Sequence, residues 1–87
     1  MSKSQIEGML RTAFEPHYLD VIDESAAHAG HAGAMQSGGG HYHVVIVSEA
    51  FEGKSKVERH RMVYEVLKPI QMLIHAISIY PKSLSEF

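Results

Sequence analysis

The chain has 87 residues, of which 45% are hydrophobic and 21% are charged, and its formal net charge is -2. This length predicts one domain over residues 1–87 and excludes a second one. The chain has no cysteine, which excludes disulfides, thiol catalysis and a thiolate metal site made by this chain alone. The negative charge argues against a strong overall attraction to nucleic acid, and no apolar run is long enough to span a bilayer.

The first residues predict a helix that is followed by a strand. Ser4 and Glu7 have the spacing of a capping box, and apolar residues then recur with helical periodicity. Pro16 breaks this pattern, and a weaker alternation predicts a first strand over residues 18–24. This start contains neither an apolar signal core nor an Arg-rich transit sequence. We therefore expect a cytoplasmic location, or an organellar matrix if a presequence has been removed.

The next segment, residues 25–40, is a long loop without any Lys, Arg, Asp or Glu. It contains His28 and His31, and loops of this length are often functional. Residues 41–48 follow as a nearly continuous apolar run, which predicts a strand in the centre of a sheet.

A second helix and a third strand are predicted in the last part of the chain. Ser55 and Glu58 form another capping-box pattern, and Pro69 should end or distort the helix that follows. Residues 74–80 predict the third strand, which we expect Pro81 to stop, and the remaining residues have room for about one helical turn.

These elements predict an α+β fold with the order αββαβα. The first two strands can form a hairpin, and a helical crossover should place the third strand parallel to the second. The expected architecture is a two-layer sandwich with a three-stranded mixed sheet. Its core should contain Ile6, Leu10, Val44, Ile46, Val63, Leu67 and Ile77.

One stretch, residues 51–64 with the sequence FEGKSKVERHRMVY, combines F-x-G, R-H-R and V-Y elements. The sequence IHAISI follows at residues 74–79, and D-E-S at residues 23–25 precedes His28. In these motifs and their order, the chain resembles the BolA family over nearly its whole length. The resemblance implies an αββαβα fold similar to the class II KH arrangement.

The resemblance also implies a function, that of a non-enzymatic adaptor in iron-sulfur cluster assembly, trafficking or iron regulation. Its expected partner is a monothiol glutaredoxin, which with glutathione would share a [2Fe-2S] cluster with this chain. His75 and a loop histidine are the implied ligands. The D-E-S-x-x-H spacing points to His28 as the loop ligand, and the H-x-x-H spacing makes His31 a substitute. The isolated protein is expected to be a monomer without cofactor.

The histidines also have structural interpretations that need no metal. A regular strand would place His75 on the same face as Ile77 and Ile79, where a partly buried structural histidine is common. The same position, at the end of a strand, is rigid enough to hold a metal ligand. His41 and His43 share one face of their strand and could also bind a metal, although we expect His41 to be structural.

The alternative function is that of a KH-like, nucleic-acid-binding transcriptional regulator of stress or morphogenesis. Its candidate contacts are basic residues near the start of the second helix, where phosphate is favoured. A KH domain clamps the nucleic-acid backbone with a G-x-x-G loop, but the second glycine is missing after Gly53. We therefore expect weak DNA binding. The candidate residues are Lys54, Lys56, Arg59 and Arg61.

An enzyme is not expected. The fragment Gly53-Lys54-Ser55 is too short for a phosphate-binding loop of the G-x-x-x-x-G-K-[ST] kind. The carboxylates near the first strand have no nucleophile or base predicted beside them.

Overall fold

The computed structural model describes residues 2–24 and 40–87, which form the predicted succession of helix, strand, strand, helix and strand. The last element is a single 3-10 turn. In chain order the elements are α1 (Ser2–Phe14), β1 (Tyr18–Asp23), β2 (Gly40–Val47), η2 (Glu49–Phe51), α3 (Lys56–Leu67), η3 (Lys68–Leu73), β3 (Ile74–Lys82) and η4 (Leu84–Glu86). None of the helices in the described ranges is long and apolar enough to cross a membrane.

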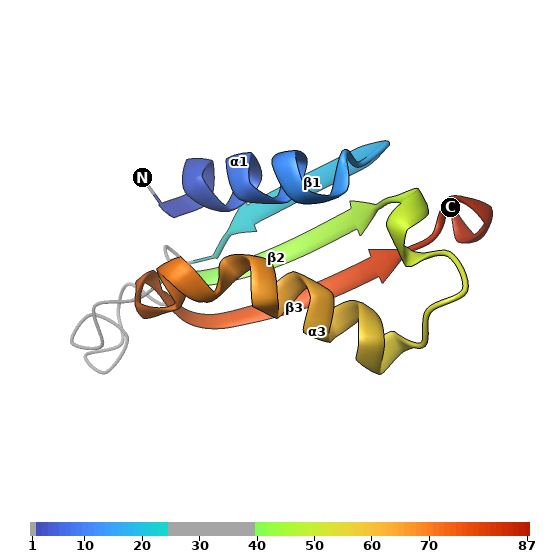
Figure 1. Cartoon of the computed structure of the whole chain (residues 1–87). Helices are drawn as coiled ribbons and strands as arrows, with labels where there is room; N and C mark the ends of the chain where they lie inside the picture. The colour runs from blue at the N-terminus through green and yellow to red at the C-terminus, as the bar shows by residue number, and fades with distance from the viewer. Residues whose placement is uncertain (1, 25–39) are drawn as a thin grey trace.

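The three strands form one mixed sheet in the order β1-β2-β3, as predicted. β1 is antiparallel to β2, and β3 is parallel to β2 because α3 and η3 carry the chain back to the start of the sheet. In the view of Figure 1, α1 runs along β1 and α3 runs along β3. β2 therefore lies in the centre, whereas β3 is an edge strand.

The core lies between the sheet and the two α-helices, which contribute to a single buried cluster. Ile77 is only partly buried, and Ile79 takes the core position on β3 that we had expected Ile77 to fill. The other six expected core residues are buried. They are Ile6, Leu10, Val44, Ile46, Val63 and Leu67.

The ends of α3 follow the local sequence signals. The backbone N–H of Glu58 donates to Ser55 Oγ at 3.1 Å, and the Ser55 N–H donates to Glu58 Oε1 at 2.8 Å. The hydrogen bond from the Ser55 backbone, followed by one from the Ser55 side chain, holds the pKa of the Glu58 carboxyl below its ordinary value. α3 ends at Leu67, and Pro69 lies at the start of η3. Both predictions for this helix are confirmed.

Two predicted boundaries are wrong. α1 begins at Ser2, so Ser4 lies inside the first turn and is not the N-cap. β3 continues through Pro81 to Lys82. The Ser48 N–H donates to the Lys82 carbonyl, which therefore points toward β2. The backbone groups of successive strand residues point alternately to the two sides of the strand, so those of buried Pro81 point away from β2. Its missing N–H therefore removes no bond of the sheet.

Candidate functional site

Two histidines that are far apart in the sequence meet at one end of the sheet. Because β2 and β3 are parallel, their first residues lie side by side. The rings of His41 on β2 and His75 on β3 have their centroids 4.9 Å apart, with the ring planes tilted by 42°. His75 is exposed, whereas His41 is half-buried. His75, the main candidate ligand from the sequence, therefore lies next to His41.

A β-bulge at the start of β3 sets the position of His75. Gly40 pairs with Ile74 and His41 pairs with Ala76, so His75 is an extra residue with no partner of its own in the register. Ile74 packs against the core, while His75 next to it is exposed. The expectation that His75 shares a face with Ile77 was based on a regular strand, and the bulge overturns it. Bulges commonly redirect a side chain in this way.

The surroundings of His75 are mostly apolar. A hollow of about 320 Å³ lies between the C-terminal part of α3 and the first residues of β3. His75 is one of its lining residues. The others are Tyr64, Leu67, Gln71, Ile74, Ala76 and Ile77.

The segment that carries the two loop histidines begins and ends beside this pair. The Glu24 N–H donates to the His41 carbonyl at 2.7 Å, and Gly40 is the first residue of β2. His28 and His31 themselves lie outside the described residues. Within ranges 2–24 and 40–87, no three His, Cys, Asp or Glu side chains come close enough to hold a metal ion. At this end of the sheet, the described residues bring the imidazoles of His41 and His75 together.

The remaining described histidines of the sheet and of α3 have other neighbours. The ring of His43 lies 4.6 Å from that of Tyr80, between centroids. His60 Nδ1 donates to the Lys56 carbonyl within α3 at 2.7 Å, which leaves Nε2 as the acceptor of the neutral ring.

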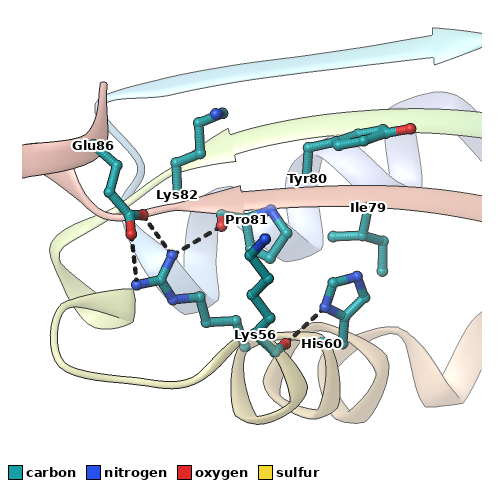
Figure 2. Close-up of a pocket in the computed structure, with 8 residues that line it drawn as sticks. Lys56, His60, Ile79, Tyr80, Pro81, Lys82 and Glu86 are labelled. Atoms are coloured by element: carbon teal, nitrogen blue, oxygen red, sulfur yellow. Dashed lines mark hydrogen bonds and ion pairs between the residues drawn. The ribbon is translucent and has the colours of Figure 1, made fainter.

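Of the four basic candidates for nucleic-acid binding, Arg59 is engaged inside the protein. Its guanidinium donates to the Pro81 carbonyl at 3.2 Å and forms an ion pair with Glu86 at 2.5 Å, both drawn as dashed lines in Figure 2. It also donates to the Lys54 carbonyl at 3.0 Å. The hydrogen bond from Arg59 is the main reason why the pKa of Glu86 is lowered to about 2. Arg59 thus joins α3, β3 and η4, and little of its charge is available to a ligand.

The other three candidates, Lys54, Lys56 and Arg61, are exposed. The structure adds a neighbour for one of them, because Lys56 and Lys82 line the same hollow of about 540 Å³. Sequence reasoning missed Lys82, which belongs to a strand that reaches α3 only through the crossover. No local signal could have revealed this contact.

Comparison with known proteins agrees with this fold. A family model described as "BolA-like protein" matches residues 10–86. The DNA-binding transcriptional regulator BolA of Escherichia coli (strain K12) is 36% identical over all of this chain and 80% of its own length. Protein BOLA1, chloroplastic, of Arabidopsis thaliana is 41% identical, and the match covers 95% of this chain and 54% of that protein.

The solved structure of the BolA domain of SufE1 from Arabidopsis thaliana superposes with a TM-score of 0.82 at 38% identity. The match covers 99% of this chain and 95% of that domain. The fold defines a class of small two-layer α+β domains. They have a three-stranded mixed sheet and a histidine at the start of an edge strand. The chain belongs to the BolA-like protein family.

Proposed function

We propose that this protein is a non-enzymatic adaptor that binds a monothiol glutaredoxin and shares a [2Fe-2S] cluster with it and with glutathione. It would act in iron-sulfur cluster assembly or trafficking, or in iron regulation, and we expect it in the cytoplasm or in an organellar matrix. The observation that carries the proposal is the exposed His75, which a bulge separates from the core and which lies against His41.

The donor chemistry fits a cluster that is completed by a partner. Imidazoles replace two of the four thiolates in known His-ligated [2Fe-2S] clusters. This chain has no cysteine, so any thiolates must come from another molecule. An exposed imidazole at the start of a strand is accessible to such a partner and is held on a rigid element. The apolar hollow next to His75 would be covered by the same partner.

The second ligand is proposed to be His28, with His31 as its substitute. His28 is the fourth residue after Glu24, which is bonded to the His41 backbone. A fully extended chain spans at most roughly 3.6 Å per residue, so the Cα of His28 stays within about 14 Å of that of Glu24. His31 is seven residues from Glu24 and nine from Gly40, so its shortest tether to a described residue is longer than that of His28. Connectivity therefore allows His28 to reach the end of the sheet where His75 lies.

Nucleic-acid binding is the second candidate function. It is supported by the name of the Escherichia coli relative, a DNA-binding transcriptional regulator, and by the exposed Lys54, Lys56 and Arg61. We also propose, as part of this second candidate function, that the fold is related to class II KH domains. The net charge of -2 and the internal role of Arg59 limit the expected affinity.

The deciding experiment mixes the protein with a monothiol glutaredoxin, glutathione, iron and sulfide, and records visible absorption and circular dichroism. The proposal expects cluster bands that differ from those of the glutaredoxin alone. Bands identical to those of the glutaredoxin alone would reject the shared cluster. A gel-shift titration with duplex DNA at physiological salt tests the second candidate on the same preparation.

A further inference from the structure

The outer edge of β3 has no partner strand among the described residues. The Lys82 carbonyl points toward β2, and alternation then directs the backbone groups of Pro81, Ile79 and Ile77 outward. The Pro81 carbonyl is used by Arg59, which closes one end of this edge. The N–H and C=O groups of Ile77 and Ile79 therefore remain as a short template for another strand.

α3 runs beside this edge and presents a row of side chains to it. Lys56, His60 and Tyr64 follow one another at intervals of four residues, so they lie on one side of the helix. Lys56 and His60 line the larger hollow together with residues of β3 (Figure 2), and Tyr64 lines the smaller one next to His75. The two hollows lie along one edge strand, and His75 is at its start.

Positive charge is concentrated at the larger hollow, although the whole chain is negative. Lys56 and Lys82 both line it, and neither forms an ion pair within the described residues. The acidic side chain at this hollow, that of Glu86, is already neutralised by Arg59. Lys82 alternates with the buried Pro81 and points to the face of the sheet opposite to α3, whereas Lys56 comes from α3. Within the described part of the chain, two lysines without ion pairs thus flank the two sides of this strand edge.

We infer that the groove between α3 and the outer edge of β3 binds an extended acidic segment of a partner protein. The segment would add a strand next to Ile77 and Ile79. Carboxylates of adjacent residues, which point to opposite faces of a strand, would face Lys56 on the α3 side and Lys82 on the other side. An extended peptide offers N–H and C=O groups alternately, which matches the edge of a sheet. A phosphodiester backbone offers only acceptors, which would meet the outward carbonyls of β3. This inference goes beyond the shared cluster and does not depend on it.

The test uses the full chain and a defined probe, an acetylated and amidated hexapeptide of sequence Glu-Glu-Val-Glu-Glu-Val, whose adjacent Glu side chains point to opposite faces of the added strand. A peptide with Lys in place of Glu is its control. Amide NMR spectra should show shifts at residues 77–82, and the N–H groups of Ile77 and Ile79 should exchange more slowly with solvent. The Lys control peptide should produce neither effect at the same concentration.

Charge-reversal variants test the role of the two lysines. The double variant Lys56→Glu/Lys82→Glu should weaken binding by about tenfold or more, because both favourable charge contacts become repulsive. The matched variant Lys3→Glu/Arg11→Glu changes the net charge equally on α1 and should stay within about twofold. All four residues are exposed, so far-ultraviolet dichroism should show the same fold in both variants.

Several results would overturn the inference. Equal weakening by the two double variants would show a general charge effect. Absence of protection at Ile77 and Ile79, even with millimolar peptide, would reject strand addition. Binding of a thymidine oligonucleotide with no binding of the peptide would assign the groove to nucleic acid. Self-association abolished by Lys56→Glu/Lys82→Glu would assign it to a second copy, whose edge strand β1 carries Asp20 and Asp23.

Discussion

The rings of His41 and His75 lie 4.9 Å apart across the starts of two parallel strands, and only His75 is exposed. The difference in exposure gives the two histidines different expected roles. His75 can reach a ligand held by another molecule, whereas His41 supports the ring of His75 and the end of the sheet. The bulge that separates Ile74 from Ala76 creates this arrangement.

Replacing each histidine of this pair should therefore give different results. His75→Ala should abolish or strongly alter the cluster shared with glutaredoxin, since no cysteine can replace the lost imidazole. His41→Ala should mainly lower the free energy of unfolding, by about 1 kcal/mol. His43→Ala is the control, because its ring packs against Tyr80. Visible dichroism and urea unfolding measure the two effects, and an unchanged spectrum for His75→Ala would remove it from the ligand set.

The loop histidines can be ranked by the same spectra. His28→Ala should perturb the cluster more than His31→Ala, because His28 has the shorter tether to Glu24 at this end of the sheet. If the two substitute for each other, only the double variant removes all loop ligation. Full retention of the cluster in the double variant would leave this segment without a metal role.

The ion pair between Arg59 and Glu86 should make stability depend on acidity. The pKa of Glu86 falls from its ordinary 4.5 to about 2 in the folded protein, mainly through the hydrogen bond from Arg59. The stabilisation is then fully present above about 4.5 and is lost as the pH falls toward about 2. Glu86→Gln should be less stable than the natural chain at pH 6, and this difference should shrink between these two values. Glu65→Gln is the exposed control; a difference that is constant with pH would contradict the assignment.

Gly40, which directly precedes His41, should tolerate no side chain. A Cβ added at Gly40 would lie 2.6 Å from Tyr42 Cε2, and the Tyr42 ring is buried in the core. Gly40→Ala should therefore cost about 1–3 kcal/mol in urea unfolding. Gly8→Ala is the matched control: its added Cβ meets no atom within 4 Å. In the middle of α1 it should stabilise by up to about 1 kcal/mol. Equal stability of the two variants would mean that the Tyr42 ring moves freely.

DNA binding should be weak and sensitive to salt. Few phosphates can be neutralised by Lys54, Lys56 and Arg61, so few counterions are released on binding. Replacing these three residues by Ala should abolish the residual affinity in a gel-shift titration, while the shared cluster still forms. Tight, sequence-specific binding at physiological salt would instead make the regulator the leading function.

The sequence by itself determined the features that depend on neighbours within a few residues. The capping box of Ser55 and Glu58 and the end of α3 before Pro69 were predictable, because both depend on hydrogen bonds within one turn. The order of the elements followed from their periodicity, and the family from motifs that are short and local. His75 was selected in this way, without knowledge of its neighbours.

The tertiary structure decided everything that depends on strand register and on the crossover. Periodicity alone placed His75 on the face of Ile77, and only the pairing with β2 reveals the bulge that frees it. Pro81 was expected to stop β3, but an edge strand accepts it, and edge position is a property of the whole sheet. From the sequence, Arg59 was expected to be a surface cation available to a ligand, but the fold brings Glu86 beside it. These contacts join residues that are distant in sequence, so their geometry is fixed only when the sheet and helices pack together.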